Sequence, residues 1–227
     1  AEPAKLAELF RHGRVEQLER GATLSHGGLD GGVALLLEGL ATFAFLDARG
    51  RYHTFALVLP GRTIGDLDAL NPNCTNVIAE CICPSRVLIV ANSDYRRALR
   101  TSTELMEMYA DLSILKEETI IEGAFANFTM DLDRRLRVLF LALFLESGRE
   151  LSLENWNDCP VSLSVTEIAQ IVAGNRSWVS TRLSEWAREG LFRKTGRTMS
   201  ARAELFESVK DWIPDKKVVE PVSVEIP

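Results

Sequence analysis

Short apolar runs separated by turn residues fill about the first 90 residues of the chain. Each run has the length of a β-strand, and pairs such as Pro60-Gly61 mark the turns between them. Short strands at such close spacing form antiparallel sandwiches, so we expect an antiparallel β-roll, or jelly roll, in this region. The strands are expected at residues 33–37, 41–46, 53–59 and 86–91.

A helical pattern begins near Ser93, and its main element is a long helix expected over residues 103–127. A stripe of apolar side chains with three- and four-residue spacing fits the seam between two helices, which predicts a dimer formed along this helix. The alternative is that the stripe packs against its own domain. The stripe consists of positions 105, 108, 112 and 115, followed by Ile120, Ile121 and Phe125.

A hinge is expected at Phe128-Thr129-Met130, before a helix over residues 131–146 that is rich in Leu, Val and Phe. Residues 147–162 have the composition of a loop. Residues 164–199 then predict two short helices, a tight turn and a hairpin.

Caps and an apolar face mark the two short helices. Ser164 and Glu167 have the spacing of a capping box. In the turn, Gly174 is expected to take a positive φ and Asn175 to cap the second helix. Both helices have an apolar inner face, made of Ile168, Ala169, Ile171, Val172, Val179, Leu183 and Trp186.

The outer face of the second helix is polar and cationic, with Arg176, Ser177, Ser180 and Arg182. A helix of this kind, held in place by a preceding helix, fits the major groove of duplex DNA and contacts base edges there. The segment therefore predicts DNA binding.

The charge distribution supports this prediction although the net charge of the 227-residue chain is −6. Residues 161–203 carry seven basic and three acidic side chains, whereas residues 101–160 carry five and twelve. Positive charge thus collects in the helix-turn-helix segment, as attraction to phosphates requires. The chain has neither an apolar run of about 18 residues nor a signal-peptide pattern, so we expect a cytoplasmic protein with no membrane partner.

Three segments together resemble the Crp/Fnr family of bacterial transcription regulators: Leu-Glu-Gly-Leu-Ala at 37–41, Leu-Pro-Gly-Arg-Thr-Ile-Gly-Asp-Leu at 59–67, and the 164–199 block. The likeness covers residues 5–205. It implies an α+β fold with a β-roll over 1–102, a dimerisation helix over 103–128, a winged helix-turn-helix domain over 129–215 and a tail at 216–227.

The resemblance also implies a homodimer on a pseudo-palindromic double-stranded DNA operator, with RNA polymerase as a further partner. An effector would bind between the β-roll and the long helix. Lys194 and Arg197 flank the hairpin turn and are expected to contact phosphates. The residues expected at the DNA are Ser164, Asn175, Arg176, Ser177, Trp178, Ser180, Thr181, Arg182, Lys194 and Arg197.

Arg176 is the main candidate for a base contact, bidentate to a guanine, with a phosphate contact as the alternative. Family members that read a G·C pair use an Arg, a Glu directly after it and a second Arg four residues beyond the Glu. Arg176, Ser177 and Thr181 hold these positions here, so the operator is expected to differ from the family's usual half-sites. Trp178 is expected either at a thymine methyl group or packed against the wing.

The effector site departs from the cyclic-nucleotide binders of this fold. In those proteins a Gly-Glu-Leu turn contacts the ribose, and an Arg-Ser pair nine residues later holds the phosphate. Here the pair falls on Asn76 and Val77, which cannot replace a charge-assisted bond to phosphate, so cyclic AMP is not expected to bind. We expect instead an apolar pocket formed from Gly65, Asp66, Leu67, Asn76, Val77, Ile120 and Ile121.

Three kinds of effector stay open: an apolar small molecule, haem, or a redox signal. His26 and His53 are candidate haem ligands, with surface or core histidines as the alternative. Cys74, Cys81 and Cys83 are candidates for a metal or redox site, with buried inert thiols as the alternative.

Enzymatic function is not expected, because the chain has no Walker loop, no Gly-x-Ser-x-Gly elbow, no His-Glu-x-x-His and no dinucleotide fingerprint. The predicted function is sequence-specific, DNA-binding transcription regulation by an effector-controlled homodimer. The alternative is a cyclic-nucleotide-type regulatory module with no DNA role.

Overall fold

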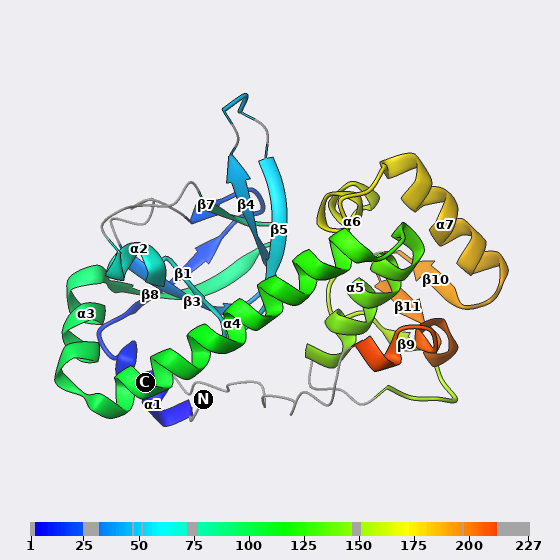
Figure 1. Ribbon diagram of the computed structural model, residues 1–227. Coiled ribbons are helices and arrows are strands. Elements are labelled where there is room, and N and C mark those ends of the chain that lie inside the picture. The colour runs from blue at the N-terminus through cyan, green and yellow to red at the C-terminus, as the bar shows by residue number, and fades with distance from the viewer. Residues whose placement is uncertain are drawn as a thin grey trace. The chain divides into compact units, whose positions relative to one another are not determined.

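The computed structural model describes residues 3–24, 32–46, 48–50, 52–71, 77–146, 151–196 and 198–212 (Figure 1). The chain divides into two compact units, of which the first runs to Ile121 and the second begins at Glu122. The first unit combines two β-sheets with helices, and the second is mainly helical with one small sheet, which confirms the expected α+β fold. None of the helices in the described ranges is long and apolar enough to cross a membrane.

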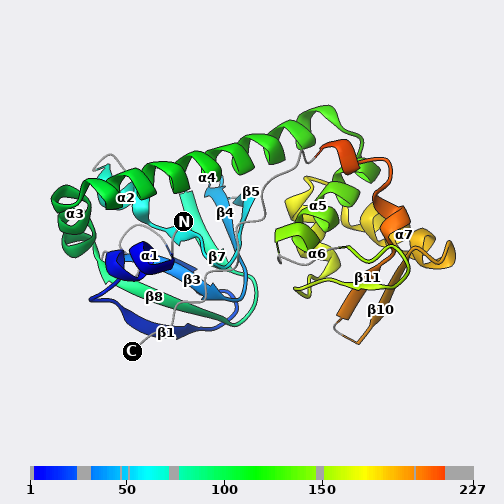
Figure 2. The same ribbon diagram turned by 90° about the horizontal axis from the view of Figure 1, so that it is seen from below.

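The first unit is a β-roll of two four-stranded antiparallel sheets, ordered β1-β8-β3-β6 and β2-β7-β4-β5 (Figure 2). The four strands expected from the sequence are present as β3, β4, β5 and β8. The other strands are short or polar, and the sequence pattern did not reveal them. The elements are α1 (Pro3–Leu9), β1 (Arg14–Leu18), β2 (Thr23–Leu24), β3 (Gly32–Glu38), β4 (Ala41–Leu46), β5 (Tyr52–Val58), β6 (Thr63–Ile64), α2 (Asp66–Leu70), β7 (Val77–Cys81), β8 (Ser85–Ala91) and α3 (Asn92–Thr101).

Strand β3 is a continuous apolar run because both of its faces are buried. Successive side chains of a strand point to opposite faces. Ala34 and Leu36 belong to the core between the two sheets. Val33 and Leu35 belong to a second cluster, in which α1 and α3 cover the outside of the roll (Figure 2). The long helix is needed to complete this second cluster.

Helix α4 (Thr103–Thr129) corrects the expected dimer stripe. Leu105 and Met108 are 2% and 5% exposed and belong to the cluster with α1 and α3, against which Leu112 also packs. This part of the stripe therefore packs on its own domain, because the outer apolar face of β3 and β8 needs a cover. The later stripe members Ile121 and Phe125 are exposed, and so are three further apolar side chains of α4: Met106, Ile114 and Phe128.

The second unit contains a helix-turn-helix followed by a β-hairpin wing. The chain leaves α4 at Thr129 and enters α5 at Leu132, so the break lies at Met130-Asp131, and Phe128 and Thr129 belong to α4 rather than to a hinge. A three-stranded antiparallel sheet is ordered β10-β11-β9, and β9 lies in the segment that was expected to be a loop. The elements are α5 (Leu132–Glu146), β9 (Asn157–Asp158), α6 (Val165–Ile171), α7 (Arg176–Arg188), β10 (Phe192–Thr195), β11 (Thr198–Ala201) and two 3₁₀ turns at Ala203–Phe206 and Lys210–Trp212.

Aromatic side chains hold α7 and the wing on α5. The Phe140 ring of α5 meets the Trp186 ring of α7 edge to face at 6.4 Å and the Phe192 ring of β10 at 5.6 Å. Trp186 is fully buried, so α7 has a large apolar anchor at its centre of contact with α5.

Candidate functional site

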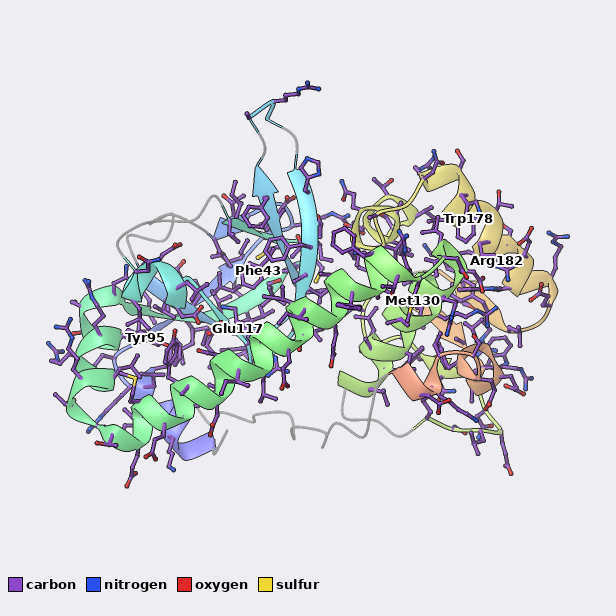
Figure 3. The ribbon with its side chains drawn as sticks, in the orientation of Figure 1. Phe43, Tyr95, Glu117, Met130, Trp178 and Arg182 are labelled. Atoms are coloured by element: carbon purple, nitrogen blue, oxygen red, sulfur yellow. The ribbon has the colours of Figure 1, made fainter. Side chains whose placement is uncertain are left out.

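Helix α7 presents a polar face to solvent and buries an apolar one. Its N-cap is Asn175, whose side-chain oxygen accepts hydrogen bonds from the backbone N–H groups of Ser177 at 2.8 Å and Trp178 at 3.4 Å. The expected inner residues Val179, Leu183 and Trp186 are all buried. The outer surface consists of Arg176, Ser177, Ser180 and Thr181, with Trp178 38% exposed (Figure 3).

The turn before α7 is built differently from the expectation. The positive φ belongs to Ala173, at 49°, and not to Gly174. Gly174 is instead packed closely, because a Cβ atom there would lie 2.7 Å from Cδ1 of Leu132 and 3.0 Å from its Cδ2, so the Leu132 side chain would have to move. The close approach seats the turn directly against the first residue of α5.

The capping box of α6 is present as expected. The Glu167 backbone N–H donates to Ser164 Oγ at 3.2 Å, and the Ser164 backbone N–H donates to Glu167 Oε2 at 2.6 Å. Both side chains thus fix the start of the helix that supports α7. Any contact of Ser164 with DNA would add to this structural role.

Arg182 does not extend into solvent as expected. It forms an ion pair with Asp133 of α5, and its Nη1 donates to Glu185 Oε2 at 2.8 Å (Figure 3). Its guanidinium also lies 5.8 Å from the centre of the Trp186 ring. These contacts tie α7 to α5, so we remove Arg182 from the set of base-contacting residues.

Asp133 joins two arginines on the buried side of α7. It accepts a second hydrogen bond from Arg137 Nε at 2.7 Å, and the Arg137 guanidinium lies 5.2 Å from the centre of the Trp186 ring. Burial raises the pKa of the Asp133 carboxyl, but the hydrogen bonds from Arg182 and Arg137 outweigh it, so this pKa lies below its usual value. The carboxylate is therefore ionised at neutral pH and holds both cations.

The wing is a hairpin formed by β10 and β11 with Gly196 at a φ of 61° in its turn. Glycine adopts this left-handed conformation at little cost. Lys194 is exposed on the wing, as expected for a phosphate contact, whereas Arg197 lies outside the described residues.

The expected effector turn contains a buried ion pair. Asp66 begins α2 and is 2% exposed. Lys116 of α4 reaches it: its Nζ donates to Asp66 Oδ1 at 2.7 Å and to the Thr63 carbonyl at 3.4 Å, and lies 5.0 Å from the centre of the Phe43 ring. The carboxylate that corresponds to the ribose-contacting Glu in the cyclic-nucleotide binders is thus already paired within the chain.

This charged contact replaces the expected apolar lining. Leu67 and Ile121 are 52% and 59% exposed, whereas Val77 packs against the core between the sheets. Gly65 takes a φ of 83° and caps α2, and Ile120 is half-buried. Asn76 lies outside the described residues.

The cysteines and histidines do not gather into a site in the described part of the chain, where no group of three or more His, Cys, Asp or Glu side chains has the arrangement of a metal site. Burial raises the pKa of the Cys81 thiol, which favours the inert form. Cys83 is half-buried, and its Sγ lies 4.0 Å from the Leu40 carbonyl oxygen. His53 is exposed on β5, and both Cys74 and His26 lie outside the described residues.

Lys116 and Asp133 are the two residues that sequence reasoning missed. Lys116 had a signal, since it is the only basic residue in the whole of α4. Asp133 had none, because its partner Arg182 lies 49 positions away and its own helix offers another partner at Arg137.

A β-roll, a long helix and a winged helix-turn-helix follow one another along the chain. No family model matches the sequence, and no curated protein matches it. Many solved structures are similar in fold, and three of them illustrate the likeness. FixK2 from Bradyrhizobium japonicum has a TM-score of 0.69 at 15% identity over 84% of this chain and 92% of its own.

TTHB099, a CRP-family transcriptional regulator from Thermus thermophilus, has a TM-score of 0.66 at 22% identity, covering 84% of this chain and 94% of its own. The c-di-GMP responsive global regulator CLP from Xanthomonas campestris has a TM-score of 0.65 at 12% identity, covering 88% of this chain and 99% of its own. The chain therefore has the fold of the CRP/FNR transcriptional regulators.

Proposed function

We propose that the protein is a sequence-specific DNA-binding transcription regulator that acts as a homodimer. The observation that carries the proposal is α7 itself: a helix capped by Asn175 and anchored by buried Trp186, with Arg176, Ser177, Ser180 and Thr181 exposed along it. A helix anchored on one side and polar on the other suits insertion into a major groove. The CRP/FNR fold supports this interpretation.

The dimer is proposed to form through the exposed apolar side chains of α4. Ile114, Ile121, Phe125 and Phe128 are 55%, 59%, 58% and 88% exposed. Their spacing of seven, four and three residues is that of a coiled-coil seam, and water contact at four large apolar groups on one helix is unfavourable. Two such chains would place their α7 helices on the half-sites of a pseudo-palindromic operator.

Replacement of Ile121 by Glu tests this seam. We expect sedimentation velocity to show a dimer for the wild type and a monomer for Ile121→Glu, while the matched change Met106→Glu, outside the seven-four-three pattern, leaves the dimer intact. A wild-type monomer at micromolar concentration contradicts the proposed dimer.

Effector control is proposed to act through the β-roll without a cyclic nucleotide. Asp66 is paired with Lys116, and neither side chain is well exposed. An incoming ribose would have to break a buried ion pair to reach the carboxylate, at a cost that a neutral sugar hydroxyl does not recover. The effector is thus proposed not to be a cyclic nucleotide. The candidates are the three expected from the sequence: an apolar compound, haem or a redox signal.

Selection of bound fragments from a random DNA pool tests the proposed function. We expect a pseudo-palindromic site with half-sites one helical turn apart. Arg176→Ala should then lower the affinity by about 1–3 kcal/mol and relax the preference at one base pair of each half-site. Arg188→Ala removes an exposed arginine from the last turn of the same helix and serves as the control.

Two results would decide against these assignments. An equal loss of affinity for every operator variant would make Arg176 a phosphate contact. Failure of the wild type to select any DNA at low salt would leave the regulatory module without a DNA role as the function.

A further inference from the structure

Two arginines of the wing lie over one tryptophan ring. The guanidinium carbon of Arg193 lies 4.4 Å from the centre of the Trp156 ring, and that of Arg202 lies 5.0 Å from it. Arg193 belongs to β10, Arg202 directly follows β11, and Trp156 directly precedes β9. We call these three residues the arginine–tryptophan cluster. Each member thus lies in a strand of the wing sheet or directly beside one.

Strand register explains why the three side chains meet. Phe192, Ala201 and Asn157 form one cross-strand row, and all three are buried on the inner face of the sheet. Since side chains alternate between faces along a strand, the residue next to each of them points to the outer face. Those neighbours are Arg193, Arg202 and Trp156.

The two guanidinium groups lack a compensating carboxylate. Within the part of the chain that the structure describes, neither Arg193 nor Arg202 forms an ion pair, in contrast to Arg137 and Arg182. Asp158 points to the same outer face and accepts a hydrogen bond from the Ser200 hydroxyl at 2.7 Å, but it forms no ion pair with either arginine in the described part of the chain. Two like charges held at one ring repel each other, and an anion bound to both would remove that repulsion.

The ring also leaves the donors of each arginine available. A guanidinium that contacts an aromatic ring through its face keeps its N–H groups directed outward in its own plane, where they match the oxygen atoms of a phosphate. Cation–π contact restricts the long side chains before any ligand arrives, so less conformational entropy is lost on binding.

We propose that the arginine–tryptophan cluster binds a phosphodiester of the DNA backbone outside the base pairs that α7 reads. This inference rests on the proposed DNA-binding function and adds a second contact surface to it, on the outer face of the wing sheet. Arg193 and Arg202 contact the phosphate, and Trp156 positions them. An acidic protein surface is the other anion that two arginines attract, and the experiment separates the two.

The test compares the selected operator with short and with extended flanks. Binding is measured by fluorescence anisotropy at several salt concentrations for the wild type, Arg193→Gln, Arg202→Gln, the double variant and Trp156→Leu. Arg100→Gln, an exposed arginine of α3 in the other unit, is the control with the same change in charge.

Each glutamine variant is expected to weaken binding roughly threefold to tenfold on the extended fragment, by the same factor for all base changes in the operator, and to reduce the salt slope by about 0.9 per lost phosphate contact. The short fragment should show little difference. Trp156→Leu keeps both charges and should still weaken binding to the extended fragment, because the arginines lose their platform. If Trp156→Leu does not fold, the double glutamine variant alone decides the matter.

Two outcomes overturn the inference while the proposed function stands. In the first, the wild type binds its operator, and the double variant binds each fragment with the same affinity and the same salt slope as the wild type. The other is a double variant that keeps DNA affinity but loses binding to RNA polymerase, which would assign the cluster to an acidic protein surface. If the wild type binds no DNA, the proposed function fails first.

Discussion

Replacing Lys116 by methionine removes the cation from a buried ion pair and leaves the shape of the side chain nearly unchanged. The Asp66 carboxyl, which is 2% exposed, would then lack the ammonium group that pairs with it at 2.7 Å. The methionine would still pack near the Phe43 ring, over which the Lys116 ammonium lies at 5.0 Å. The substitution therefore isolates the electrostatic contribution of this contact.

The expected loss is about 3 kcal/mol of unfolding free energy. Removing one partner of a buried ion pair typically costs about 3–5 kcal/mol, and the methionine offsets part of this by its packing. Asp66→Asn in the same chain removes the stranded charge, so the double variant should recover at least half of the loss. Arg97→Gln breaks an exposed pair with Asp94 in the same unit and should cost no more than about 0.5 kcal/mol.

Urea unfolding is to be followed by two signals at once. All four tryptophans, Trp156, Trp178, Trp186 and Trp212, lie beyond Glu122, so tryptophan fluorescence reports on the second unit. Hydrogen exchange at the amides of β3 and β8 reports on the β-roll. Lys116→Met should accelerate exchange in these strands and leave the fluorescence transition nearly unmoved.

If the free energy of unfolding of the β-roll in Lys116→Met lies within about 1 kcal/mol of the wild-type value, the ion pair does not stabilise the β-roll as expected. A double variant that is no more stable than Lys116→Met would contradict this expectation equally, because the loss would then come from packing and not from an unpaired carboxylate.

Two further predictions concern the second unit, and one concerns the β-roll. Gly174→Ala should destabilise the second unit by about 1–3 kcal/mol and lower the midpoint of the fluorescence transition, since its Cβ would meet Leu132 Cδ1 at 2.7 Å. If the loss in the double variant Gly174→Ala/Leu132→Ala equals the sum of the losses in the two single variants, a clash with Leu132 is contradicted. Asp133→Asn should destabilise the unit at pH 7, and the deficit should shrink as the pH falls below about 4 and towards the lowered pKa of Asp133, because a carboxyl with a lowered pKa stabilises the fold only while it is ionised. A deficit that does not depend on pH would show that the charge is irrelevant. Calorimetric titration with cyclic AMP should give no binding at micromolar concentrations, because Asp66 is already paired, and a micromolar dissociation constant would overturn the proposed use of this turn.

Local patterns were enough to predict most of the fold. The apolar runs of β3, β4, β5 and β8 and the caps Ser164 and Asn175 depend on residues close in sequence, so their spacing revealed them. Short strands such as β2 and β9 contain only two residues each, which is too few for any alternation to be visible.

Contacts between distant residues were not predictable in the same way. Arg182 has a charge and a helix position that suit DNA, and only the fold shows that Asp133 lies within reach. The first part of the expected dimer stripe was wrong for a related reason, because Leu105 and Met108 have helical spacing whether they face a second chain or their own β-roll. Periodicity identifies a buried face, but it does not identify the surface that buries it.

The bonds around Asp133 have a mechanical consequence for α7. Arg182 and Trp186 fasten α7 to α5, and Gly174 seats the preceding turn on Leu132, the first residue of α5 after the break at Met130-Asp131. A rotation of α5 that begins at Leu132 should therefore move α7 with it. Such a construction favours movement of α5, the turn and α7 as one rigid piece over an independent tilt of α7.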